Sequence, residues 1–150
     1  MAKTICGIDV GMKGALAFYD IAELMCYEMP TFERNKTHRL DGHRIAEILK
    51  INQPDHVWVE QVNAFGMGAT SAYNFGYGCG LIEGVLSSLG IPFSFVTPQV
   101  WKKAMQCPVN KDGARARATQ LFPDYAHNWS LKRQDGVAEA AIISLYGFSK

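Results

Sequence analysis

The sequence predicts an α/β fold, a mixed sheet flanked by helices, and two observations lead to this class. Three short apolar runs with short connections open the chain, which is typical of an antiparallel meander. Helix-like and strand-like segments then alternate, and helix-like segments close the chain. The 150 residues are enough for one domain, residues 1–150, with a sizeable core of its own.

The N-terminal third predicts three strands and one helix. Apolar runs at residues 4–10 and 15–19 flank a short glycine-containing turn, and a weaker run follows at residues 24–29. Residues 40–51 carry apolar side chains at helical spacing, and Asp41 is placed to cap this helix.

The middle of the chain predicts a strand, a long helix and another strand. The first strand, residues 56–60, follows Pro54. Residues 70–89 predict the helix, which ends at Gly90, and residues 92–96 predict the second strand.

Four glycines interrupt the long predicted helix: Gly76, Gly78, Gly80 and Gly84. Each glycine in a helix interior costs about 1 kcal/mol relative to alanine. Three of them recur every four residues, which indicates that another backbone approaches this face closely. A second copy of the chain could supply that backbone in a homodimer. The protein's own sheet or last helix is the alternative.

The C-terminal third predicts three helices. Thr97 before Pro98 is typical of a helix start, and this short helix runs through residue 102. Residues 111–122 predict a basic helix, and residues 133–146 predict the last one.

Basic residues cluster in two segments, although the formal net charge is only +1. Residues 96–134 hold seven bases and two acids, residues 34–50 hold five and two, and the rest of the chain holds three and ten. Such clustering favours a polyanionic partner, with a solvated surface as the alternative.

The composition is that of a globular protein, with 48% hydrophobic and 11% aromatic residues, which argues against disorder. No apolar run reaches the roughly 18 residues of a membrane span. The cysteines are Cys6, Cys26, Cys79 and Cys107, and no two form a C-x-x-C pair. We expect reduced, buried thiols in a cytoplasmic protein, with a disulfide or a zinc site as the alternative. The host cytoplasm and an organelle are further possible locations.

Two acids lie at the ends of apolar strands. Asp9 shares a strand face with Ile5 and Gly7, and Glu60 shares one with Trp58. Buried carboxylates are costly unless they are paired or bind metal. Asp9 could instead begin a turn, and Glu60 could pair with a base.

Two more acids, Asp135 and Glu139, are four residues apart on the last helix and so share one face. That face continues through Ile142 and Tyr146, which predicts burial. The four carboxylates carry −4, which two divalent ions would cancel, and carboxylate oxygens suit Mg²⁺ or Mn²⁺. Alternatively, Asp135 could cap the helix and Glu139 could lie on the surface.

Three motifs resemble the RuvC family of Holliday-junction resolvases, within the ribonuclease H-like superfamily. They are Gly7-Ile8-Asp9-Val10-Gly11, Glu60-Gln61-Val62 and Asp135-Gly136-Val137-Ala138-Glu139-Ala140. The resemblance covers nearly the whole chain. The sequence looks more like the phage and organellar branches of the family than like the main bacterial branch.

The resemblance implies a five-stranded mixed sheet, a homodimer and a magnesium-dependent nuclease that cuts two strands of a four-way DNA junction symmetrically. By the same match, Asp9, Glu60, Asp135 and Glu139 would hold two ions, about 4 Å apart in such sites. The bacterial pattern has two aspartates three apart on its last helix, whereas here an aspartate and a glutamate are four apart.

The family also places an aromatic wedge after its strand-end glutamate. The candidates here are Phe65 and Met67, although Phe65 could instead anchor its loop to the core. We expect Lys111 or a neighbour to neutralise charge that builds on the phosphate. Further bases expected to contact the DNA backbone are Lys102, Lys103, Arg115, Arg117, Lys132 and Arg133.

Three other functions are alternatives. A nuclease of the same superfamily that cuts RNA–DNA hybrids or ribosomal RNA would use the same metal site. The spacing of Asp9, Gly11 and Gly14 also matches the phosphate loop of sugar kinases and actin-like ATPases, but that fold needs two such domains and 150 residues are too few. A junction-binding protein without activity would not need all four acids.

Overall fold

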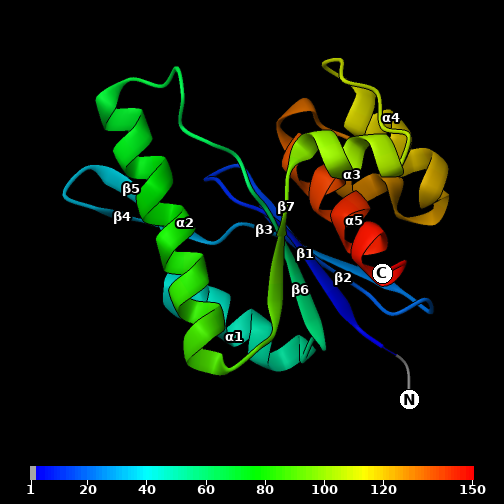
Figure 1. Ribbon diagram of the computed structural model, residues 1–150, viewed down its shortest axis with the longest axis horizontal. Helices are drawn as coiled ribbons and strands as arrows, with labels where there is room; N and C mark the ends of the chain where they lie inside the picture. Colours follow the sequence, from blue (N-terminus) through cyan, green and yellow to red (C-terminus); the bar gives the residue numbers. More distant parts are fainter. Residues whose placement is uncertain (1–2) are drawn as a thin grey trace.

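The computed structural model describes residues 3–150 and contains a central five-stranded sheet (Figure 1). Its strands are β1 (Ile5–Asp9), β2 (Ala15–Tyr19), β3 (Leu24–Glu28), β6 (His56–Glu60) and β7 (Phe93–Val96). They lie in the order β3-β2-β1-β6-β7. β2 is antiparallel to β1 and β3, whereas β6 is parallel to β1 and β7. The predicted five-stranded mixed sheet is confirmed.

Helices cover both faces of this sheet. They are α1 (Gly42–Asn52), α2 (Ala69–Leu89), α3 (Pro98–Ala104), α4 (Gly113–Leu121) and α5 (Asp135–Phe148). One core forms between the sheet and α1 with α2, and includes Ile8, Leu16 and Ile82. The other forms beneath α3, α4 and α5, and includes Ala17, Trp101 and Ile142.

Several predicted boundaries shift by a few residues. Asp41 caps α1 as predicted, because its carboxylate accepts the Arg44 N–H at 3.1 Å. The basic helix begins at Gly113, which leaves Lys111 in the turn before it. The last helix begins at Asp135, and the residues before it, Lys132–Gln134, form a short 3-10 segment.

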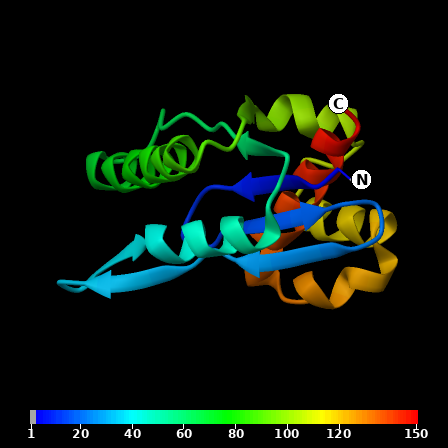
Figure 2. The ribbon, with the colours of Figure 1, turned by 90° about the horizontal axis from the view of Figure 1, so that it is seen from below.

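The sequence analysis missed a two-stranded hairpin, β4 (Thr31–Arg34) with β5 (Thr37–Leu40). Figure 2 shows it extending beyond the sheet. β4 is exposed along its whole length, so it lacks the apolar alternation that marks a half-buried strand. Asn35 and Lys36 form its turn with φ of 52° and 62°, a conformation for which Asn-Gly is the usual signal.

The glycine stripe on α2, made of Gly76, Gly80 and Gly84, faces away from the rest of residues 3–150. A Cβ added at Gly76, Gly80 or Gly84 would meet no atom within 4 Å. The prediction that the stripe packs on the protein's own sheet or last helix is therefore wrong for these three. Only Gly78 turns inward, where Leu40 lies 3.2 Å from the position of its absent Cβ.

The structure also bears on the cysteines and on the absence of a membrane span in the sequence. None of the four cysteines forms a disulfide within residues 3–150. Cys6 and Cys107 are buried, as predicted, whereas the prediction of burial is wrong for Cys26 and Cys79, which are half-buried. Among residues 3–150, no helix combines the length and the apolar character that crossing a bilayer requires.

Candidate active site

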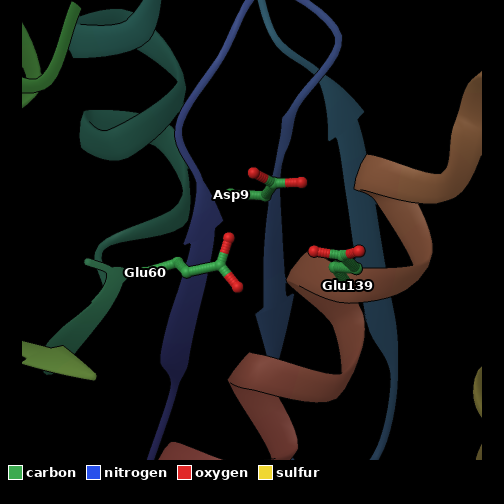
Figure 3. A group of neighbouring side chains, drawn as sticks. All are labelled: Asp9, Glu60 and Glu139. Atoms are coloured by element: carbon green, nitrogen blue, oxygen red, sulfur yellow. The ribbon is translucent and has the colours of Figure 1, made fainter. Parts of the chain in front are cut away.

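Three carboxylates converge at one edge of the sheet: Asp9, Glu60 and Glu139 (Figure 3). One oxygen from each lies within 4.8 Å of the others. β1 and β6 are parallel neighbours with Ile8 paired to Val59, so the residues that follow this pair, Asp9 and Glu60, meet at the same edge. Glu139 reaches them from the second turn of α5.

Two glycines bring α5 close enough for this contact. A Cβ at Gly7 on β1 would collide with the backbone of Ala140 and Ser144. A Cβ at Gly136 on α5 would collide with the backbone of the β1–β2 turn and lie 3.0 Å from Asp9 Oδ2. The helix can therefore rest directly on the strand, and Glu139 faces Asp9.

Burial and mutual repulsion make the three carboxylates hard to ionise. Burial raises the pKa of Asp9 well above its usual range, and the charges of Glu139 and Glu60 raise it further. Burial, with repulsion from Glu60, raises the pKa of Glu139 from 4.5 to about 7. The pKa of Glu60 is also raised by burial, although a hydrogen bond from Trp101 opposes the shift.

This arrangement fits a divalent cation. Carboxylate oxygens are the ligands that Mg²⁺ and Mn²⁺ prefer, and a cation would relieve the repulsion among the three charges. Lys102 lowers the pKa of all three carboxylates, and a single positive charge leaves most of their negative charge uncompensated.

The metal-free protein should become less stable as the pH rises from about 5 to about 7. The pKa of Glu139 is raised in the folded state, so the folded protein binds more protons than the unfolded chain in this window, and the free energy of unfolding falls as those protons leave. Thermal unfolding in a chelator should show a lower melting temperature at the upper end of the window.

Mg²⁺ should reduce the difference in melting temperature between about pH 5 and about pH 7, because it stabilises the ionised carboxylates. Glu139→Gln should flatten the pH dependence, whereas Glu23→Gln should retain it, because Glu23 is exposed between β2 and β3. An identical slope in Glu139→Gln and wild type would contradict the assignment.

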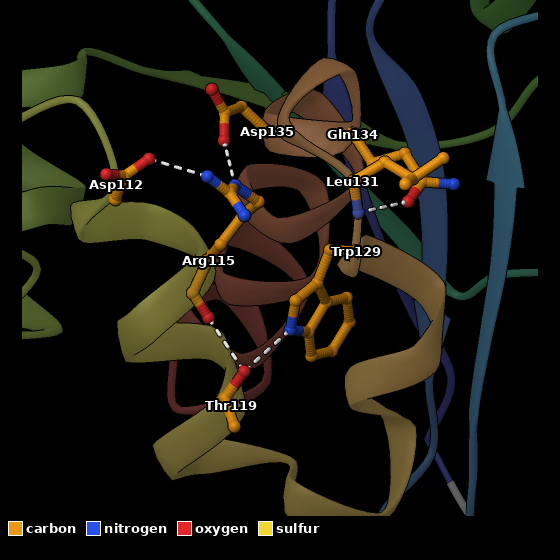
Figure 4. A network of polar contacts seen from close by, with 7 residues as sticks. All are labelled: Asp112, Arg115, Thr119, Trp129, Leu131, Gln134 and Asp135. Atoms are coloured by element: carbon orange, nitrogen blue, oxygen red, sulfur yellow. Dashed lines mark hydrogen bonds and ion pairs between the residues drawn. The ribbon is translucent and has the colours of Figure 1, made fainter.

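Asp135 lies outside the group of three. Its carboxylate accepts a 2.6 Å hydrogen bond from Arg115 Nε, and Arg115 also pairs with Asp112 (Figure 4). Asp135 nevertheless lines the same open pocket as Asp9 and Glu139. The alternative role as a helix cap is wrong, because Asp135 is the first residue of α5 and the cap position belongs to Gln134.

The predicted DNA-contacting bases fall into two groups. Some are engaged within the chain: Arg115 as above, Arg117 with the Met105 carbonyl at 2.8 Å, and Arg133 with Glu28 at 3.0 Å. The others make no ion pair within residues 3–150: Lys102, Lys103, Lys111 and Lys132. Lys132 and Arg133 line the pocket, together with Lys13, which the sequence analysis did not single out.

The wedge candidates lie on the loop between β6 and α2. Phe65 is 91% exposed and Met67 is 40% exposed. The alternative role of Phe65 as a core anchor is therefore wrong. The Asn63 side chain accepts the Phe65 N–H at 3.0 Å and so orders the backbone beneath this exposed ring.

The sequence matches no family profile and no curated protein. Solved structures are similar to it in fold. Thermus thermophilus RuvC in complex with a Holliday junction substrate aligns at 15% identity and a TM-score of 0.69, covering 98% of this chain and 95% of that one.

One eukaryotic and one viral structure are also similar to this chain in fold. The yeast mitochondrial Holliday junction resolvase Ydc2 aligns at 14% identity and a TM-score of 0.51, covering 95% of this chain and 76% of that one. Fowlpox virus resolvase with Holliday junction DNA aligns at 15% identity and 0.52, covering 97% and 98%. These structures share the fold predicted for this chain, a five-stranded mixed sheet flanked by helices.

Proposed function

We propose that this chain, which shares the fold of RuvC-type resolvases, is a metal-dependent endonuclease that resolves four-way DNA junctions. One observation carries the proposal: the convergence of Asp9, Glu60 and Glu139 at the edge of a sheet with this fold. Two of the similar structures hold Holliday junction DNA. The free thiols suit a reducing compartment that contains DNA, such as the cytoplasm or an organelle.

The three carboxylates would hold the metal, and we propose two Mg²⁺ ions, with Mn²⁺ as a substitute. When bound, such ions activate a water molecule and stabilise the leaving oxygen of a phosphodiester. Asp135 also lines the pocket that Asp9 and Glu139 line, and Arg115 donates hydrogen bonds to the carboxylates of both Asp135 and Asp112. The protein's own contribution is to keep the acids close together before the metal binds.

Lys102 is placed to balance charge at the site. Its positive charge lowers the pKa of all three carboxylates, and Lys111 is not among the charges that act on them. We therefore propose Lys102 for the neutralising role that was predicted for Lys111 or a neighbour. Lys111 is exposed before α4 and suits contact with a DNA backbone.

A cleavage assay in Mg²⁺ tests the substrate class. A four-way junction should be cut at two symmetrically placed sites, while a linear duplex of the same sequence and an RNA–DNA hybrid stay intact. Cleavage of the hybrid without cleavage of the junction would instead favour the hybrid or ribosomal RNA nuclease. Junction binding without any cleavage would favour the non-catalytic alternative.

Lys111→Ala should weaken junction binding for every sequence and lower the salt slope of log K by about one unit. The reason is the loss of one cation that contacts phosphate without reading bases. The measurement is fluorescence anisotropy across a salt series.

Lys50→Ala is the matched control. Lys50 is also exposed, but it lies in the last turn of α1, just before β6 begins, and so at the opposite edge of the sheet from the carboxylates. Its removal should leave the slope unchanged. If both variants lower the salt slope by the same amount, Lys111 does not make the proposed phosphate contact.

We also propose a homodimer, since two symmetrical cuts need two active sites related by a two-fold axis. The exposed stripe of Gly76, Gly80 and Gly84 is the surface where two copies of α2 could approach most closely. Exposed Tyr73 and Tyr77 flank the stripe at its N-terminal end, and they would add apolar contact area.

A further inference from the structure

Trp101 makes a direct contact with one of the three site carboxylates. Its Nε1–H donates to Glu60 Oε2 at 2.7 Å, across 41 residues of sequence. The indole is fully buried, and Glu60 is 7% exposed. Within residues 3–150, no other side chain donates a hydrogen bond to Glu60.

The fold fixes the position of this indole. β7 pairs with β6 in a register that sets Val96 opposite Glu60, and the Gln61 N–H bonds to the Val96 carbonyl at 2.8 Å. Thr97 and Pro98 then begin α3, whose fourth residue is Trp101. The indole is therefore held against the strand end that carries Glu60.

The chemistry of the contact gives it a consequence for metal binding. An indole N–H is a neutral donor that cannot accept, so it occupies one carboxylate oxygen without competing as a cation would. Glutamate has one more rotatable bond than aspartate and loses more side-chain entropy when it is ordered. A fixed donor on Oε2 restricts that freedom and leaves Oε1 for an ion.

We propose that Trp101 is a positioning residue, which holds Glu60 in the orientation that binds the divalent metal. The inference rests on the proposed function in one respect, the binding of an ion at the three carboxylates. Hydrogen bonds from outer-shell partners to metal ligands typically change metal affinity about 10- to 100-fold.

A second buried tryptophan provides a matched control. Trp129 is 2% exposed, and its Nε1 donates at 3.0 Å to Thr119 Oγ1 and not to a site carboxylate (Figure 4). Trp129→Phe therefore removes the same N–H and the same volume from the core as Trp101→Phe. A role limited to packing predicts the same behaviour for both variants.

The test is Mn²⁺ binding to the DNA-free protein, followed by electron paramagnetic resonance, with thermal unfolding measured alongside. Trp101→Phe should weaken Mn²⁺ binding by about 10-fold or more, whereas Trp129→Phe should keep the wild-type affinity. Both should lower the melting temperature of the metal-free protein. Equal Mn²⁺ affinity in the two variants would overturn the proposal.

A second replacement covers the case in which Trp101→Phe does not fold. Benzothienylalanine at position 101 keeps the shape of the indole and replaces its N–H with sulfur, so the same loss of affinity is expected from a packed core. Wild-type affinity in that protein would also overturn the proposal.

The outcomes separate this inference from the proposed function. A wild-type protein that binds Mn²⁺ through Glu60 but leaves junctions intact would refute the junction nuclease and retain the role of Trp101. A wild-type protein whose Mn²⁺ binding is unchanged by Glu60→Gln would refute both.

Discussion

Asp9→Asn should abolish cleavage of a four-way junction while leaving junction binding intact or tighter. A metal ion supplies several kcal/mol of charge stabilisation, and each 1.4 kcal/mol or so is a factor of ten, so we expect a rate loss of about a thousand-fold or more. Asparagine keeps the shape of the side chain but removes its charge from beside Glu60 and Glu139. Single-turnover cleavage with gel-resolved products measures the rate.

Binding should survive because a negative charge near the DNA phosphates has been removed. The metal-free variant should also melt at a higher temperature than wild type. Burial, with repulsion from Glu139 and Glu60, raises the pKa of Asp9, and a neutral amide avoids both costs. Glu60→Gln should lose cleavage in the same way.

Glu23→Gln is a control for net charge, because Glu23 is exposed between β2 and β3. It should cut at the wild-type rate. Asp135→Asn should cost less than Glu139→Gln, because Asp135 lies outside the group of three. An Asp9→Asn protein that cuts at a near wild-type rate in Mg²⁺ would place the active site elsewhere.

The positions of the two strand acids were predictable from sequence. Asp9 and Glu60 each end an apolar run, and strands that are parallel and adjacent bring such ends together. Glu139 was predictable from its spacing on the apolar face of the last helix. These predictions succeed because periodicity and burial are local properties of the chain.

The role of Asp135 was harder to predict, because the spacing that pairs it with Glu139 says nothing of where the helix begins. α5 starts at Asp135, so Glu139 lies one turn, about 6 Å, further along the axis. Only Glu139 reaches the strand ends. The Arg115 that binds Asp135 comes from another helix, and no pattern around either residue indicates the pair.

The contact of Trp101 with Glu60 was not predictable for a related reason. A tryptophan in a short helix is an ordinary core residue, and its indole N–H gains a role only when tertiary packing brings a carboxylate to it. The same holds for Lys102. Its charge lowers the pKa of Glu139 because the fold brings the two residues close, and membership of a basic cluster in the sequence does not predict this.

Gly80→Leu should convert the protein from dimer to monomer, and paired cuts at a junction should give way to slow single nicks. A Cβ at Gly80 meets no atom of residues 3–150 within 4 Å, so the larger side chain has room in the monomer. Between two closely packed copies of α2 it would have none. Sedimentation velocity gives the oligomeric state, and a cruciform plasmid distinguishes linear from nicked product.

Gly80→Ala and Gly78→Leu are the comparison variants for Gly80→Leu. Alanine at 80 should strengthen the helix by about 1 kcal/mol, and loss of the dimer in this variant would indicate contact as close as backbone against backbone. Leucine at 78 should instead destabilise the monomer, because Leu40 occupies that side of α2. A leucine at position 80 would not fit between two copies of α2 in close contact. A Gly80→Leu protein that remains folded and dimeric and still cuts both strands would therefore show that the dimer interface lies elsewhere.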